Sequence, residues 1–314
     1  MSHPPRHQSG SLLIITLWLV TILSMLAIAI ARYLSLEVRV TKYQLAREQA
    51  AALARSGLYL AMRRLAADAT TGEPEDKAYD WAGDDWAEDP GVADGTTVTV
   101  HDENGRLSLN GISAEELGRL AIPAALVQTI VDARDAPDPA EDRPDWNPPY
   151  LAKNGLFAAA EELSDLPEMT PEAYNAIRAS TTPYATPEEP LNINTVSPEV
   201  MHLVGLSDQA VRLVMQFREG GDGPEAHAED GVFTDAGLGI TKTLTDHIGV
   251  NLDGTPDGAL LTGTRFGVSS TLFTIIAESR LERPKVRVRL EAVVRRTGCP
   301  DGAGPCVVAW RQPS

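Results

Sequence analysis

The longest apolar segment of the chain runs from Leu12 to Ala31 and contains no charged side chain. A hydrocarbon core about 30 Å thick is crossed by roughly 20 helical residues at 1.5 Å rise per residue, so residues 11–31 are predicted to form a transmembrane helix. A cleaved secretory signal is the weaker interpretation. Its apolar region would be about 7–15 residues long and would end at small residues, whereas Arg32-Tyr33-Leu34 follows here.

The charges on either side of this segment bear on its orientation. Arg6 and two histidines precede it, which favours a cytoplasmic N-terminus and a C-terminal part outside the cytoplasm. Arg32, Arg39 and Lys42 follow it and argue mildly for the opposite orientation.

The helical pattern continues beyond the apolar segment. Residues 32–64 contain no proline and one glycine, Gly57, and consist mainly of good helix formers. We therefore expect one helix from about Ser11 to Ala67, about 80 Å long, with its first half in lipid and its second half packed on a globular part. The alternative is a separate amphipathic linker.

Strand-like patterns lie on both sides of a long helical stretch. The runs Thr96–Val100 and Leu107–Leu109 flank an Asn-Gly turn, which predicts a β-hairpin. Further alternating runs span Leu272–Ser279 and Val286–Val294, with a possible last strand at Val307–Trp310.

The stretch between these strands repeats itself. The 29 residues from Leu107 align without gaps with those from Leu191. Each copy begins with a capping Asn and Ser and continues as a short helix, a tight turn and a second helix. The matched identical pairs are Leu107/Leu191, Asn110/Asn194, Ser113/Ser197, Glu115/Glu199, Val127/Val211 and Arg134/Arg218. Two helical hairpins are therefore predicted.

The second hairpin resembles the helix-hairpin-helix module, which often binds DNA backbones. That module exposes backbone N–H groups at closely spaced glycines. Here the turns read Gly205-Leu206-Ser207-Asp208 and Ala121-Ile122-Pro123. The second glycine is missing, Asp208 would repel phosphate and Pro123 lacks a donor, so the shape is expected without DNA binding.

The net charge changes sign along the chain. Residues 1–64 carry a net charge of +6 and residues 65–314 a net charge of −23, which gives −17 overall. The acidic part disfavours nucleic acid as a partner and suits a soluble surface or a hard divalent cation.

Two acidic clusters lie in loops broken by Pro and Gly, where carboxylates could bind Ca²⁺ through 6–8 oxygens. The first comprises Asp132, Asp135, Asp138, Glu141, Asp142 and Asp145; the second comprises Glu219, Asp222, Glu225, Glu229, Asp230 and Asp235. Neither has EF-hand spacing, and a solvated acidic loop is the alternative for each.

Other chemistry is sparse. The chain has no HExxH, GxSxG or Walker-type motif, so we do not expect an enzyme. Cys299 and Cys306 flank a Pro/Gly-rich turn, which predicts a local disulfide if this part lies outside the cytoplasm. A zinc pair fits less well because no further ligands lie nearby.

The N-terminal arrangement resembles type IV pilin-like precursors. In that family prepilin peptidase cleaves after the glycine that precedes the apolar helix. The resemblance implies cleavage between Gly10 and Ser11, with Ser11 as the methylated N-terminus. Pilins usually carry glutamate at the fifth mature position, where this chain has Ile15. A glutamate in lipid is costly unless paired, so a subunit with Ile15 does not need a neighbour's amine.

Further segments narrow the resemblance to the K-type minor pseudopilins of type II secretion systems (the general secretion pathway protein K family), which lack that glutamate. The segments, in order, are Asp102–Asn110, Val131–Asp135, Glu161–Leu163 with Met169–Glu172, and Leu191–Thr195.

This resemblance implies an α+β fold in which a pilin-like long N-terminal helix packs on an antiparallel β-sheet, interrupted by a large α-helical insertion. The implied divisions are a leader (1–10), the transmembrane half of the helix (11–31), the stem helix with the first hairpin (32–111), the insertion (112–265) and the return to the sheet (266–314).

The resemblance also implies calcium binding, single-pass insertion in the inner membrane and a periplasmic C-terminal domain. The implied partners are the I and J minor pseudopilins, other pseudopilus subunits, the inner-membrane secretion platform and prepilin peptidase, with a role in capping the pseudopilus tip. The alternatives are a minor pilin of a type IV pilus and, less favoured, a membrane-anchored DNA receptor.

Overall fold

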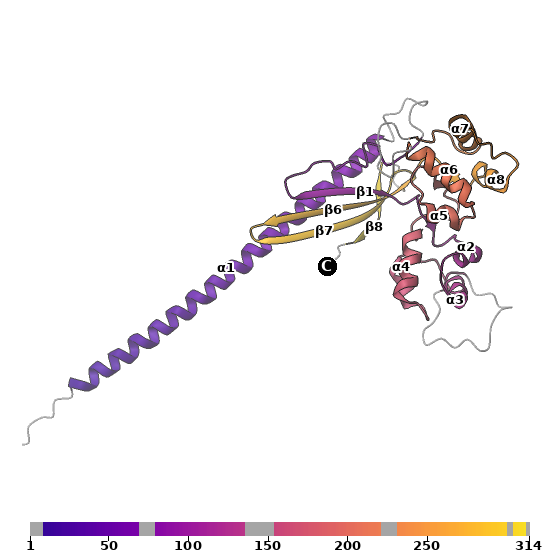
Figure 1. Cartoon of the computed structure of the whole chain (residues 1–314). Helices are drawn as coiled ribbons and strands as arrows, with labels where there is room; N and C mark the ends of the chain where they lie inside the picture. The colour runs from indigo at the N-terminus through magenta and orange to yellow at the C-terminus, as the bar shows by residue number, and fades with distance from the viewer. Residues whose placement is uncertain (1–8, 69–78, 136–153, 221–230, 300–303, 312–314) are drawn as a thin grey trace, which may run out of the picture.

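The computed structural model describes residues 9–68, 79–135, 154–220, 231–299 and 304–311. Its longest element is α1 (Ser9–Asp68), a single helix of 60 residues, about 90 Å long at 1.5 Å per residue. No break separates the apolar half from the rest, so the continuous helix is confirmed and the separate linker is wrong. Figure 1 shows α1 as a rod, with the other elements gathered at the end away from the N-terminus.

The two halves of α1 differ in burial. Side chains from Leu12 to Leu45 are exposed, and burial begins at Ala46. The buried face from there consists mostly of small residues at steps of three or four: Ala46, Ala50, Ala54, Leu58, Ala61 and Leu65. These small side chains let the helix lie close to the sheet. At Gly57 a Cβ atom would lie only 2.6 Å from Cγ2 of Val98.

A four-stranded antiparallel sheet packs against this half of α1. Its strands are β1 (Thr96–Asp102), β6 (Leu272–Glu282), β7 (Lys285–Arg295) and β8 (Cys306–Arg311), in the spatial order β1-β6-β7-β8. Alternate residues point toward α1, and Phe273 there packs edge-on against Trp86 at 5.0 Å between ring centroids. The three later strands predicted from sequence are confirmed.

The predicted first hairpin is wrong. β1 pairs with β6, and β2 (Leu107–Ser108) instead pairs in parallel with β3 (Thr181–Thr182). The reason lies in the Asn-Gly turn, where the Asn104 side-chain oxygen accepts hydrogen bonds from the backbone N–H groups of Thr271 and Leu272. These bonds fasten the turn to the start of β6, so the chain passes into the helical part instead of folding back.

The helical part lies between β1 and β6 in sequence and at the distal end of the molecule in Figure 1. Its helices are α2 (Ala114–Gly118), α3 (Ala124–Arg134), η1 (Ala160–Asp165), α4 (Pro171–Ser180), α5 (Pro198–Leu203), α6 (Asp208–Arg218), α7 (Leu238–Ile248) and α8 (Pro256–Thr262). Together with the sheet on α1, these helices give the α+β architecture expected from the sequence.

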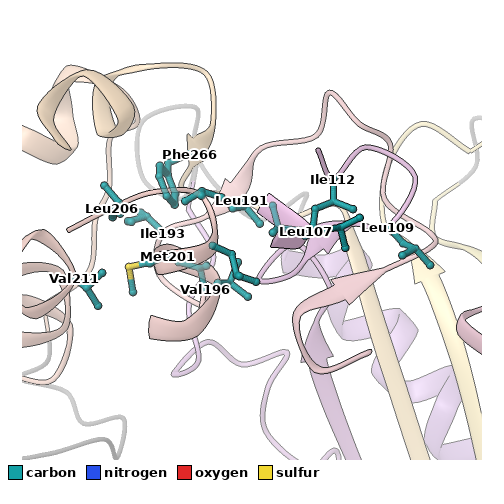
Figure 2. Packing of buried hydrophobic residues seen from close by; sticks show 14 of the residues in the cluster. Leu107, Leu109, Ile112, Leu191, Ile193, Val196, Met201, Leu206, Val211 and Phe266 are labelled. Atoms are coloured by element: carbon teal, nitrogen blue, oxygen red, sulfur yellow. The ribbon is translucent and has the colours of Figure 1, made fainter. Parts of the chain in front are cut away.

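The predicted repeat is present and is longer than the sequence pattern indicated. The first unit begins at β2 and closes at β3; the second begins at β4 (Leu191–Asn192) and closes at β5 (Phe266–Gly267), with which β4 pairs in parallel. Each unit therefore spans about 75 residues. Figure 2 shows that the apolar residues starting the two units, among them Leu107, Ile112, Leu191 and Val196, meet in one shared core.

Equivalent polar residues hold each unit closed. Asn110 accepts from the N–H of Phe157 and donates to its carbonyl, and Asn194 does the same with Phe233. These bonds recur at equivalent positions although each loop between the paired residues differs in sequence. The repeat is therefore a repeat of hydrogen bonding as well as of helices.

Candidate functional site

The apolar half of α1 has no packing partner among the residues that the structure describes. Its large hydrophobic side chains, among them Leu12, Trp18 and Met25, are more than half exposed. Within the described residues, α1 is the one helix long and apolar enough to cross a membrane, and it fits a single-pass anchor. Ile15 lies on this half and is 60 % exposed. Gly10 and Ser11 belong to the first turn of α1; their roles in processing stay predictions.

At the end of the sheet away from the apolar half of α1, a cluster of hydrogen-bonded polar side chains joins the sheet to the helical insertion. Asp102, the last residue of β1, accepts hydrogen bonds through Oδ2 from Thr195 (2.5 Å), Ser270 (2.6 Å) and Asn192 (3.0 Å). Its Oδ1 accepts from the Asn104 N–H. Burial outweighs these bonds and raises the pKa of Asp102 to about 6.

A second buried group of charges lies beside Asp102. Arg296 donates to both carboxylate oxygens of Asp80 at 2.7 Å and to Asp68 at 2.9 Å, and it lies 5.1 Å from the centre of the Phe273 ring. Asp68 ends α1, Asp80 precedes the sheet and Arg296 follows β7, so one guanidinium ties three distant segments together. Sequence reasoning missed this junction, since nothing local distinguishes these residues from surface charges.

A pocket of about 590 Å³ opens next to the junction. Its lining includes Thr99 and His101 of β1 and Ser197 and Arg218 of the second unit. Arg218 donates to the Val196 carbonyl at 2.6 Å, and burial lowers its pKa to about 10. The pocket contains cationic and hydroxyl groups, and its lining residues include no cysteine.

The hairpin turns have features that oppose phosphate binding. The N–H and hydroxyl of Ser207, at the start of α6, donate to the two carboxylate oxygens of Asp257 at 2.9 and 2.6 Å. Because a carboxylate of the chain already takes the place where a phosphate would bind, this turn is closed to an external anion. In the first unit Pro123 occupies the capping position and has no N–H.

The structure places only part of the acidic clusters. Asp132 lies on α3 and accepts from Gln128 at 2.6 Å, and Asp135 follows it and pairs with Arg134 at 2.9 Å. In the second cluster Glu219 and Asp235 are described. The remaining residues lie outside the described residues: Asp138, Glu141, Asp142, Asp145, Asp222, Glu225, Glu229 and Asp230. Among the described residues, no three His, Cys, Asp or Glu side chains gather as a metal site.

Cys299 and Cys306 form a disulfide with a Cα–Cα distance of 5.9 Å. The bond closes the segment between β7 and β8. It therefore links the edge strand of the sheet to its neighbour.

Comparison with solved structures shows a likeness that extends over most of the chain. The chain superposes on a chain of the crystal structure of the GspK-GspI-GspJ complex from the enterotoxigenic Escherichia coli type 2 secretion system, with a TM-score of 0.60 and 15 % identity. The match covers 87 % of this chain and 99 % of that chain. No protein family model and no curated protein sequence matches the chain. The likeness establishes the fold.

Proposed function

We propose that this chain is a K-type minor pseudopilin of a type II secretion system. The observation that supports this most is the fold likeness, which extends over the anchor-proximal sheet and the helical insertion together and covers nearly all of the solved chain. The ordered sequence motifs and the apolar residue at position 15 favour the same assignment.

The arrangement of the molecule suits a position at the tip of a filament. The exposed half of α1 is free to enter a bundle of similar helices, while the insertion lies at the opposite end of the rod (Figure 1). An insertion wider than the sheet would hinder addition of another subunit beyond it. The chain would be anchored in the inner membrane before assembly. It would then cap a periplasmic pseudopilus and support export across the outer membrane.

Assembly and secretion can be measured together. Deleting the chain's gene should abolish export of the host's type II substrates and leave any type IV pili intact, and the full chain should restore export. The full chain should also copurify with the I and J minor pseudopilins from detergent extracts. Loss of pili with normal export would instead identify a minor pilin and overturn the proposal.

Processing provides a separate test. Coexpression with prepilin peptidase should give a mature protein that begins at Ser11, and Gly10→Leu should block cleavage because the peptidase requires a small residue there. Ser9→Ala is the matched control and should be processed normally. A start other than Ser11 would contradict the pseudopilin assignment.

We also include calcium in the proposal. Asp132 and Asp135 offer hard oxygen ligands at the end of α3, which suit Ca²⁺, but two carboxylates supply fewer than its usual 6–8 ligands; Asp138, Glu141, Asp142 and Asp145 would complete the set. Calorimetric titration of the full chain with CaCl₂ should show binding that Asp132→Asn with Asp135→Asn weakens at least tenfold. Binding that is unchanged in this variant and weakened by Asp235→Asn would move the site to the second cluster.

A further inference from the structure

The turn between β6 and β7 concentrates positive charge in an acidic protein. Residues 280–289 contain five of the 19 Lys and Arg residues of residues 65–314 and one acid, Glu282. We name these ten residues the basic hairpin; its cations are Arg280, Arg283, Lys285, Arg287 and Arg289. The helical insertion, residues 112–265, carries 26 acids and nine basic residues. The two ends of the globular part are therefore of opposite charge.

The basic hairpin lies at the end of the sheet that faces the apolar half of α1 (Figure 1). Val286 and Val288 belong to the same core as Ala46 and Ala50, the first buried residues of α1. The α1 segment between the apolar run and Ala46 is basic as well. Its Lys and Arg residues are Arg32, Arg39 and Lys42, against one acid, Glu37. Helix and hairpin thus form one positive zone next to the anchor.

Part of this charge is neutralised within the sheet and part is not. Arg280 and Arg287 both donate to Glu278. These bonds lower the pKa of that carboxyl group, and the bond from Arg287 has the larger effect. Arg289 lies 3.7 Å from Glu291. Arg283 and Lys285 are exposed at the turn, and neither has an ion pair within the part of the chain that the structure describes.

The geometry brings the hairpin within range of a lipid surface. Ala46 lies 15 positions after Ala31, which corresponds to about 22 Å along the helix. The headgroup layer takes up roughly 5–8 Å of that length, and transmembrane helices commonly tilt by about 20° and up to 40°. Tilt toward the hairpin side brings the arginine tips to within about one Debye length, roughly 8 Å, of the headgroups.

We propose that the basic hairpin binds the anionic headgroups of the lipid leaflet next to it while α1 is anchored in the bilayer. The anchor holds the hairpin at this surface, and phosphates are the complementary charge that a bilayer presents there. The contact fixes the direction in which α1 tilts and points the acidic insertion away from the membrane. It does not depend on which leaflet the chain faces, and it goes beyond the pseudopilin assignment.

The test uses the full chain reconstituted in liposomes and labelled with bimane at Glu282→Cys, since the native cysteines are joined in a disulfide. Quenching by a lipid with a nitroxide headgroup is compared in phosphatidylcholine and in phosphatidylcholine with 30 % phosphatidylglycerol. Quenching should be at least twofold stronger with phosphatidylglycerol and should return to the neutral-lipid value in 0.5 M NaCl. A label at Glu172→Cys on α4 should be quenched weakly in both.

Charge reversal at the turn, Arg283→Glu with Lys285→Glu in the labelled chain, should remove the effect of phosphatidylglycerol. The matched control reverses two exposed cations of the insertion, Arg178→Glu with Lys242→Glu, and should leave quenching unchanged. The proposal is overturned if quenching ignores lipid charge, or if both reversals act equally. A hairpin reversal that leaves quenching intact but weakens copurification with other pseudopilins would assign the basic hairpin to a protein partner and likewise overturn it.

Discussion

Asp102 is a partly buried carboxylate whose hydrogen-bond donors are hydroxyl, amide and backbone groups rather than cations. Four donors stabilise its charge, yet desolvation dominates and raises the pKa to about 6 from the model-peptide value of 3.8. A native pKa above the unfolded one means that the folded state binds the proton more tightly. Asp102 therefore adds stability at low pH, and this contribution is lost as the pH rises through about 6.

The expected result is a pH-dependent difference between the wild type and Asp102→Asn, which cannot titrate. The unfolding free energy of the wild type relative to the variant should fall by roughly 1 kcal/mol from pH 5 to pH 7.5. Urea unfolding of detergent-solubilised protein at both pH values measures this. A difference that stays constant with pH would show that Asp102 does not titrate in this range.

Arg296 presents the opposite case, a buried cation with two carboxylate partners. Its side chain is 10 % exposed and that of Asp80 is 2 % exposed. Replacing Arg296 with Leu would leave Asp80 buried without its charge partner, so we expect a loss of about 3 kcal/mol in unfolding free energy. The control Lys242→Leu, at an exposed position, should change stability by less than about 0.5 kcal/mol. Equal effects at the two positions would contradict the role of Arg296 at the junction.

Among the elements, the two helical units differ in how deeply equivalent residues are buried. Asn194 is 5 % exposed, whereas Asn110 is half-buried and donates to the Pro183 carbonyl as well. Asn194→Ala would leave the N–H and carbonyl of Phe233 without partners and should cost about 2 kcal/mol. Asn110→Ala should cost about half as much, because water reaches that site.

Hydrogen exchange measures this prediction at the bonded groups themselves. Protection of the Phe233 amide should fall in Asn194→Ala, and that of the Phe157 amide should fall in Asn110→Ala, each with little effect on the other unit. Simultaneous loss in both units would indicate that the shared core makes them a single cooperative element.

The edge strand β8 depends on a covalent link as well as on hydrogen bonds. The disulfide closes a short loop between β7 and β8, and such a loop constrains the unfolded chain by about 2 kcal/mol. Replacing both cysteines with serine should speed amide exchange in residues 306–311 and leave β6 protected. Uniform acceleration across the sheet would mean that β8 is needed for the stability of the whole sheet.

At the scale of the whole molecule, charge separates along the axis of the rod. The anchor end is basic and the insertion has a net charge of −17. Asp257 accepts both hydrogen bonds that the Ser207 turn of the second unit could offer to a phosphate. We expect no DNA binding by the full chain in fluorescence anisotropy at 20 mM NaCl, where phosphate contacts are strongest. Salt-dependent binding at micromolar concentration would revive the DNA receptor hypothesis.

The sequence by itself determined the features that depend on local pattern. The apolar run and the helix formers after it specify one long helix, alternation specifies β6, β7 and β8, and the capping Asn and Ser residues mark both units. Each of these signals arises between residues a few positions apart, where backbone geometry alone fixes which side chains share a face.

Tertiary structure decided what depends on residues distant in sequence. The Asn104 turn has the composition of a hairpin turn, yet β1 pairs with β6, which lies some 170 residues later in the chain, and not with β2. Asp80 and Arg296 resemble surface charges until the fold excludes water from them. The basic hairpin gains a target only because the packing of β7 on the buried half of α1 sets the height of the hairpin above the anchor. Long-range pairing and desolvation are collective properties of the folded chain, so no local pattern encodes them.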